Sequence, residues 1–355
     1  MLKALEALKA AREKKQAVLI GEAAKIVATA NPEPPVSDKS ATYLTSALKK
    51  WSQGSVRQAG ADVVLRASGI HDVCPREFVL NYWMPKEKLS GFDVASNLRM
   101  SIGTELHSLF QNFFLGPLGI LHGDWLNSNG TILQTETYHP DPELAMRELA
   151  KGTAPTWEYV EKTVYDEHLR ISGHLDGMLN VDRVLWLQNN YRLVDQDAKK
   201  AVQRLHSLPC TDNLQPFELK TVNSFGYKRV VDGDSLPDYY KTQAEVYQKL
   251  TKTRNTLFCY INRDTMDFRF FNYSYTGAGW NLAVKKATTI WSAIRDESIP
   301  DSDLPCTKKT QKRAKQCPFS TECFSKIFSA KAFIAHAKRK QPERKFLDLS
   351  RWKAS

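Results

Sequence analysis

The sequence lacks several features that would place it in a familiar class. It has no run of about 18 consecutive apolar residues, the length that a membrane-spanning helix needs. Its N-terminus, MLKALEALKAAREKKQ, mixes charged residues among Leu and Ala, so we see no signal peptide and expect a cytoplasmic protein. There is no internal repeat. There is also no Gly-x-x-x-x-Gly-Lys-[Ser/Thr] phosphate loop, which argues against an ATP-driven motor.

Cysteine is scarce, and its distribution is uneven. The six cysteines are Cys74, Cys210, Cys259, Cys306, Cys317 and Cys323, the last three within 18 residues of one another. In an intracellular chain such residues are more often metal ligands or buried thiols than disulfides. No pair has the C-x₂₋₄-C spacing that is typical of structural zinc, which disfavours that metal. Cys210 and Cys259 fit no ligand pattern, and we predict a loop thiol and a core thiol.

The net charge of +11 is concentrated near the C-terminus. Residues 306–355 contain 14 Lys and Arg against 3 Asp and Glu, which accounts for the whole excess. A basic segment on a neutral body suggests contact with a polyanion such as DNA. A solvated tail is the alternative interpretation.

Composition divides the chain into three parts. Residues 1–56 form a helical N-terminal extension with a Pro-rich linker, and residues 57–300 form the main domain, with a polar insertion at about 195–213. Residues 301–355 carry the C-terminal cysteines and the basic tail.

Hydrophobic periodicity predicts the elements of the main domain. Helices are expected at 95–114, 236–251 and 278–295, strands at 131–139, 168–181, 216–222, 256–262 and 267–275, and a hairpin from 184–187 and 191–194. The predicted buried face of the first helix consists of Leu98, Ile102, Leu106, Leu109 and Phe113. Strands that alternate with helices indicate an α/β fold, with a central mixed sheet flanked by helices.

Two segments carry the residues with the clearest chemical potential. In the strand predicted at 216–222, Glu218 and Lys220 are two positions apart and therefore point to the same face, about 7 Å apart along the chain. Asp176 lies between Gly173 and Gly177, which permit a bend and close backbone approach. Two carboxylates brought together would repel each other, and a hard divalent cation with oxygen ligands would offset that repulsion.

Each of these signals has an ordinary structural explanation when it is taken alone. An E-x-K in a strand is usually a solvated face, a Gly-flanked acid is usually a turn, and a helical histidine such as His107 is usually a satisfied core residue. Gln243 and Tyr247 share one helix face with Tyr240, which is also typical of ordinary packing. The order of the signals along the chain is more specific than any of them.

That order resembles the RecB-like branch of the PD-(D/E)XK nuclease superfamily, over about residues 74–323. The branch has a histidine on a helix, an acid in a G-x-x-D segment, an E-x-K strand and a Q-x-x-x-Y helix. By this resemblance His107, Asp176, Glu218 and the Leu219 carbonyl would bind Mg²⁺ or Mn²⁺, Lys220 would position the attacking water, and Gln243 and Tyr247 would brace the site or contact DNA. The separation of Asp176 and Glu218 is longer than the family usually has.

The cysteines extend the resemblance to CRISPR-associated and AddB-type members, which bind an iron–sulfur cluster. Such members place one cysteine before the nuclease core and three after it. Cys74, Cys306, Cys317 and Cys323 match that order, so the resemblance implies a [4Fe-4S] cluster that ties the ends of the domain together. The spacing between Cys306 and Cys317 exceeds that of relatives.

These features together predict a metal-dependent DNA exonuclease that acts in recombination, repair or end resection. It would be bacterial, archaeal or phage-encoded, and would act alone or with a helicase or recombinase. The alternative is a non-catalytic DNA-binding or scaffold protein of the same fold, within a recombination or CRISPR adaptation complex. DNA cleavage with a divalent ion distinguishes the two hypotheses.

Overall fold

The computed structural model describes residues 63–86, 94–116, 119–127, 132–134, 157–182, 213–302, 304–325, 327–341, 346–347, 349 and 352. The predicted N-terminal extension (1–56), the predicted hairpin (184–194) and the insertion up to residue 212 lie outside these residues. In the part that is described, no helix is long and apolar enough to cross a membrane.

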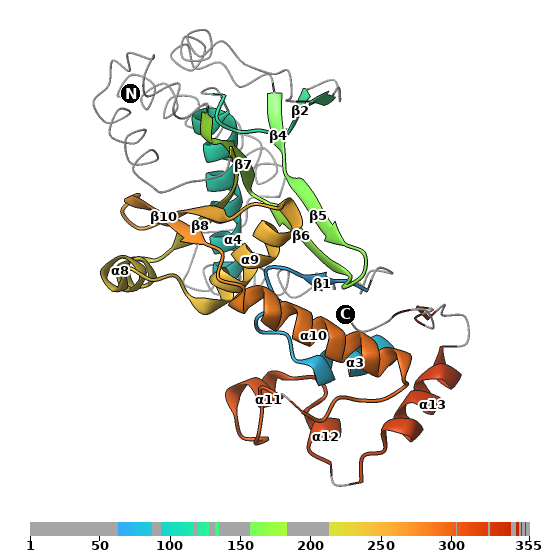
Figure 1. Ribbon diagram of the computed structural model, residues 1–355. Helices are drawn as coiled ribbons and strands as arrows, with labels where there is room; N and C mark the ends of the chain where they lie inside the picture. The colour runs from blue at the N-terminus through green and yellow to red at the C-terminus, as the bar shows by residue number, and fades with distance from the viewer. Residues whose placement is uncertain are drawn as a thin grey trace, which may run out of the picture.

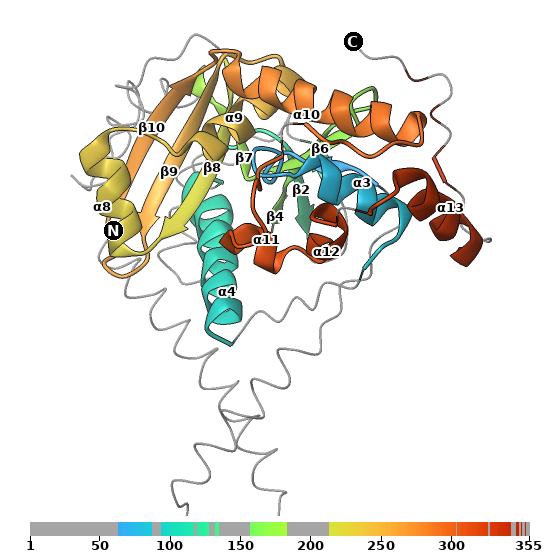
Figure 2. The ribbon, with the colours of Figure 1, turned by 90° about the horizontal axis from the view of Figure 1, so that it is seen from below.

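The central sheet has four strands in the order β10-β9-β8-β7 (Figures 1 and 2). β8 and β9 are parallel, and the other two pairings are antiparallel. The strands span Gly177–Asn180 (β7), Leu214–Val222 (β8), Asn255–Asn262 (β9) and Phe268–Ser274 (β10). Parallel strands need a crossover connection, which here contains α8 (Ser224–Gly233) and α9 (Asp238–Thr251).

Two three-stranded sheets adjoin the central one. The first has the order β1-β6-β5, and the second β3-β2-β4. Their strands span Leu65–Arg66 (β1), Asp124–Asn127 (β2), Ile132–Gln134 (β3), Trp157–Val160 (β4), Lys162–Asp166 (β5) and Ile171–Leu175 (β6). The chain passes from β4 to β5 through Glu161 and from β6 to β7 through Asp176. Both acids therefore lie where a strand ends and the next sheet begins.

Helices cover both faces of the central sheet, α9 on one side and α4 on the other (Figure 1). α4 (Val94–Leu109) continues into a π-helix, η1 (Phe110–Leu115). On the α4 side, Phe217 and Leu219 of β8 are buried, and Leu106 and Phe110 pack against their cluster. On the other side, Val230 of α8 packs in a cluster with residues of α9 and β9. The predicted α/β class, with a mixed sheet between helices, is confirmed.

A third cluster joins α9 to α10 (Ala278–Arg295), α3 (Pro75–Trp83) and the small sheet of β1 and β6. The start of α10 is anchored by Glu245 of α9. One Glu245 oxygen accepts hydrogen bonds from the Tyr273 hydroxyl (2.8 Å) and the Thr276 hydroxyl (2.6 Å), and the other accepts the Trp280 N–H (3.0 Å). A carboxylate at a helix N-terminus satisfies free N–H groups and offsets the helix dipole. Glu245 is therefore a buried structural acid.

The C-terminal segment packs back onto α3. It contains α11 (Lys312–Gln316), α12 (Ser320–Cys323) and α13 (Ala330–Lys340), of which Figure 2 shows α11 and α12 beside α3. The Lys86 ammonium donates to the Glu322 carboxylate (2.5 Å) and to the Pro318 carbonyl (2.9 Å). These polar contacts tie the C-terminal segment to the residues that follow α3.

Several predicted elements need correction. The buried face predicted for the first helix is wrong in its N-terminal half, because Leu98 and Ile102 are 60% and 44% exposed. The strand predicted at 168–181 is a turn followed by β6 and β7, because the chain bends at Asp176. α8 was not predicted. The helix predicted at 278–295 matches α10 in both bounds.

Gly173 generates a test of the fold near the site. A Cβ atom there would overlap the Tyr247 ring and lie 3.0 Å from the Ala67 Cβ. Tyr247 is 2% exposed and has little room to move, so we expect Gly173→Ala to lower the free energy of unfolding by about 1–3 kcal/mol. Denaturant titration measures this loss. Gly233→Ala is the control, because a Cβ there meets nothing within 4 Å; equal losses in both variants would contradict the packing argument.

Candidate functional site

β8 places Glu218 and Lys220 on one face of the central sheet. The strand alternates as its sequence predicts, with Phe217 and Leu219 in the apolar cluster on the opposite face. Glu218 is 0% exposed, and its carboxylate lies 2.5 Å from the Lys220 ammonium. Burial alone would lower the pKa of Lys220, but the Glu218 and Asp176 carboxylates raise it above its ordinary value. The lysine therefore stays charged.

Asp176 connects three elements at the end of β6. One of its oxygens accepts the Leu219 N–H (2.8 Å), and the other lies 3.3 Å from His107 Nδ1 on α4. Burial acts to raise the pKa of Asp176, but the contacts from His107, Lys220 and Leu219 hold it below the ordinary value. The same pairing raises the pKa of His107 in spite of the opposing effect of burial. Asp176 is therefore a carboxylate at neutral pH.

Glu218 is the acid that is least satisfied. Its Oε2 accepts from Lys220 and from the Gln243 amide (3.2 Å), whereas its Oε1 is buried without a hydrogen-bond partner among the described residues. Burial, followed by the nearby Asp176 carboxylate, raises the pKa of Glu218 to about 8. A buried acceptor without a partner costs about 1–3 kcal/mol. A cation at Oε1 would remove that cost.

Gln243 and Tyr247 of α9 join the two acidic strands. Gln243 Nε2 donates to Glu218 and also lies 3.1 Å from the Tyr247 hydroxyl oxygen. The Tyr247 hydroxyl donates to the His174 carbonyl of β6 (2.8 Å). This chain of hydrogen bonds fixes β6 relative to β8, and therefore fixes Asp176 relative to Glu218. In this geometry both side chains brace the site.

Glu161 was not predicted as a site residue. His107, Glu161 and Asp176 form a group in which one ligand atom of each lies within 4.8 Å of the others, and Glu218 is not part of that group. The register of the β5–β6 hairpin explains the position of Glu161. Lys162 pairs with Leu175, so one step further brings Glu161 opposite Asp176.

Gln111 is a second residue that sequence reasoning missed. Its amide nitrogen donates to the Asp176 carbonyl (2.7 Å) and to the Glu161 carboxylate (3.3 Å). Gln111 lies in the π-helix η1, one α-helical turn after His107. π-bulges are frequent at functional sites, because the wider turn changes which side chains face the neighbouring sheet. Gly103, four residues before His107 on α4, faces Thr221 of β8, whose hydroxyl would lie 3.5 Å from an added Cβ.

The donor set fits a hard divalent cation. Asp176 and Glu161 offer carboxylate oxygens and His107 offers a nitrogen, all within 4.8 Å of one another. Glu218, outside this group, has a buried oxygen without a hydrogen-bond partner among the described residues. Oxygen donors of this kind suit Mg²⁺, and Mn²⁺ also accepts imidazole nitrogen. The side chain of Leu219 is buried in the apolar cluster, so it contributes to the site only through its backbone.

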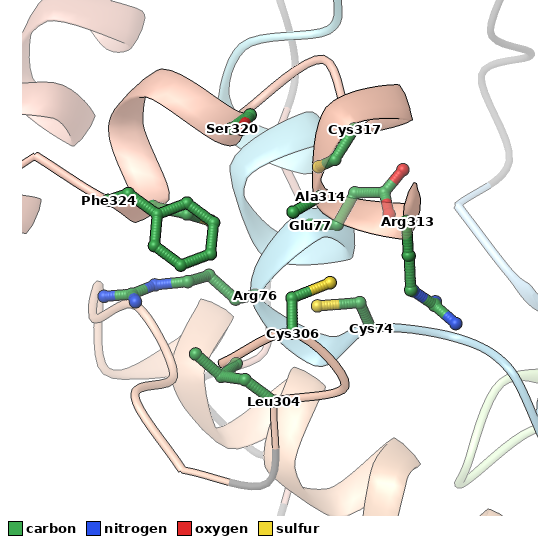
Figure 3. A pocket seen from close by; sticks show the side chains of 11 residues that line it. Cys74, Arg76, Glu77, Leu304, Cys306, Arg313, Ala314, Cys317, Ser320 and Phe324 are labelled. Atoms are coloured by element: carbon green, nitrogen blue, oxygen red, sulfur yellow. The ribbon is translucent and has the colours of Figure 1, made fainter. Parts of the chain in front are cut away.

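The four cysteines predicted as cluster ligands line one pocket. Figure 3 labels three of them, Cys74, Cys306 and Cys317. Cys74 precedes the first residue of α3, Cys317 follows α11, and Cys323 ends α12. Cys306 lies in the loop before α11 and completes the set. All four are free thiols. Burial raises the pKa of Cys74, and it raises that of Cys323 to about 11.

The spacing of the sulfurs bears on the size of the group that they could hold. Tetrahedral zinc with Zn–S bonds of about 2.3 Å would bring its sulfurs to about 3.8 Å from one another. No three of these described cysteine sulfurs lie within 4.8 Å of one another. No three of these sulfurs are therefore as close together as tetrahedral zinc would bring them. The pocket is also lined by Arg76 and Arg313, whose positive charge suits an anionic group. Cys259, by contrast, is buried in β9 as the predicted core thiol.

Comparisons with known proteins give little guidance. No protein-family model matches the sequence, and no curated protein matches it. A solved chain, described as the crystal structure of SSO0001, aligns with 12% sequence identity over 81% of this chain and 97% of that chain, at a TM-score of 0.35. A similarity of that size carries no argument about function.

The pKa of Glu218 gives a test of the site in the metal-free protein. Because the folded-state pKa is raised to about 8, the proton on Glu218 stabilises the fold at low pH, and this stability is lost as the pH rises from about 5 to 8. We expect the free energy of unfolding in EDTA to fall by up to about 1.4 kcal/mol per pH unit in that window. His107, whose pKa is also raised, adds to the fall above its ordinary pKa.

Glu218→Gln isolates the contribution of Glu218, because the amide does not titrate. Denaturant melts at a series of pH values should therefore show a smaller slope in Glu218→Gln than in the wild type. Identical slopes would mean that Glu218 does not carry the proton.

Proposed function

We propose that this chain is a Mg²⁺- or Mn²⁺-dependent deoxyribonuclease with a PD-(D/E)XK core of the RecB-like kind. The observation that carries the proposal is that Asp176, which lies 43 residues before Leu219 in the sequence, contacts β8 between Glu218 and Lys220, with His107 against Asp176. The mixed sheet between helices is compatible with such a core.

The residues divide into roles that suit phosphodiester hydrolysis. Asp176, Glu218 and His107 would hold the cation, with Glu161 as a further oxygen donor. A divalent cation supplies Lewis-acid polarisation of the scissile phosphate and makes a water molecule more acidic. Lys220 is held charged beside Glu218, above the ring of Tyr240 at 5.1 Å, where an ammonium group orients an attacking water and stabilises developing negative charge.

Exonuclease action is the form of the proposal that we favour. The RecB-like branch consists mostly of end-resecting enzymes, and the sequence has no separate module for reading DNA sequence, such as a zinc finger. A helicase or recombinase is the partner class that fits a nuclease without its own motor. The basic C-terminal segment supplies positive charges that would neutralise the phosphates of a nucleic-acid backbone.

A [4Fe-4S] cluster at the four-cysteine pocket is part of the same proposal. Cluster ligation would join Cys74 to Cys306, Cys317 and Cys323 and so connect α3 to the C-terminal segment. Metal binding of this kind contributes folding free energy, because the ligands are brought together only in the folded state. The role assigned to the cluster is structural.

Replacement of Lys220 tests the catalytic proposal. Lys220→Ala removes the charge that would stabilise the transition state, and we expect cleavage of end-labelled DNA in Mn²⁺ to fall by at least about a hundredfold. Lys285→Ala is the matched control, because Lys285 is an exposed residue of α10 that lies outside the candidate site and outside the basic C-terminal segment. Full activity of Lys220→Ala would refute the assignment. DNA binding by the wild type without cleavage would support the scaffold hypothesis.

Cysteine variants test the cluster. After anaerobic purification we expect iron and acid-labile sulfide, which Cys74→Ser should reduce together with the thermal unfolding temperature. Cys259→Ser is the control, because Cys259 is a core thiol outside the pocket and its replacement should leave the iron content unchanged. Zinc in place of iron, or equal iron in Cys74→Ser and the wild type, would contradict the cluster.

A further inference from the structure

The sheet of β1, β6 and β5 carries a row of polar side chains on one face. Thr163 of β5 pairs with His174 of β6, and Tyr165 pairs with Ser172. Arg66 of β1 pairs with Ser172 from the other side. Directly paired residues share a face of a sheet, so these five side chains lie together.

The row leads to the candidate metal site. Alternate residues of a strand are about 6.6–7 Å apart and point the same way. His174 is two positions before Asp176, and Ser172 is four positions before it. On the neighbouring strand, Glu161 is two positions before Thr163. The row therefore begins at the ends of β5 and β6 that adjoin Glu161 and Asp176, and it runs along these strands away from the metal-ligand group.

Arg66 is oriented by neutral groups. Its Nη1 donates to the Ser172 hydroxyl (3.2 Å) and lies 3.4 Å from His174 Nε2. A guanidinium group only donates, so His174 accepts at Nε2 and its Nδ1 proton points to the Thr163 hydroxyl at 3.1 Å. Within the described ranges, no carboxylate forms an ion pair with Arg66. The positive charge is thus held in place and left uncompensated on an exposed surface.

We propose that Arg66, oriented by Ser172 and His174, forms a phosphate-binding subsite for the nucleic-acid strand, one to two nucleotides from the cleaved bond. This inference rests on the proposed nuclease function, since the subsite adjoins that metal site. An arginine presents paired donors that match phosphate oxygens. Tyr165, 43% exposed on the same face, offers a ring on which a base can stack.

Binding in the absence of turnover tests the subsite. Fluorescence anisotropy in EDTA measures the affinity of the full-length protein for a short single-stranded oligonucleotide at several salt concentrations. Arg66→Gln removes one phosphate contact, so we expect affinity to fall about tenfold and the slope of log K against log salt to decrease by about 0.7. Arg66→Lys keeps the charge and should keep most of the slope.

The control is Arg269→Gln, which removes the same charge from β10, the far edge of the central sheet, where Arg269 pairs with Asp234. Thermal melts verify that each variant is folded. If Arg66→Gln does not fold, Arg66→Met replaces it, because it also removes the charge while it keeps an unbranched side chain, with the same expected loss of affinity. Affinity and salt slope equal to those of Arg269→Gln would overturn the subsite, as would a wild type that binds no oligonucleotide.

Two substrate ends distinguish the sources of phosphate. A loss confined to oligonucleotides with a 5′-phosphate assigns the subsite to a terminal phosphate, whereas an equal loss with 5′-hydroxyl ends assigns it to an internal one; both support the subsite. Its failure is separable from failure of the nuclease proposal. If the wild type cleaves DNA in Mn²⁺ but Arg66→Gln binds DNA as well as the wild type, only the subsite is refuted. If Arg66→Gln binds DNA more weakly but the wild type cleaves no DNA, only the nuclease activity is refuted.

Discussion

The burial of the Glu218 carboxylate is the constraint on which the site depends. A carboxylate that is shielded from solvent needs a nearby positive charge and hydrogen-bond donors. The positive charge comes from Lys220, which is two residues further along β8. Gln243 of α9 supplies a hydrogen-bond donor through its side-chain amide. The same amide contacts the Tyr247 hydroxyl, which donates to the His174 carbonyl of β6. The satisfaction of one buried acid thus links the central sheet, α9 and the strand that ends at Asp176.

The two acids outside the central sheet occupy equivalent places in the chain. Glu161 and Asp176 each lie between two consecutive strands that belong to different sheets. A residue at such a junction belongs to neither of the two sheets. Its side chain is therefore not confined to one face of a sheet and can point into the space between them. Gln111 donates to both, to the carbonyl of Asp176 and the carboxylate of Glu161. Gln111 therefore joins the two junctions into one polar centre.

Local patterns were sufficient for some of this arrangement. The alternation of β8 predicts the shared face of Glu218 and Lys220, and the apolar periodicity of α10 predicts both of its ends. The position of Glu161 depends on a pairing register, which no single strand encodes. The buried face predicted for α4 was wrong at Leu98 and Ile102, which are exposed, although Leu106 of the same face packs against the apolar cluster of β8. Periodicity along a helix does not show where its contact with a sheet begins.

The cysteine pocket and the Arg66 row are connected through a short segment. β1 is two residues long and lies at a sheet edge. The Leu65 N–H donates to the Arg170 carbonyl in the turn before β6 (2.8 Å), and the Ala67 N–H donates to the Ser172 carbonyl of β6 (2.8 Å). So small a strand fixes its position weakly. The turn that follows β1 ends immediately before Cys74. Lys286 of α10 donates to its His71 and Val73 carbonyls, and Arg313 of α11 donates to its Asp72 carbonyl. Packing of the C-terminal segment against this turn therefore also restrains the strand that carries Arg66.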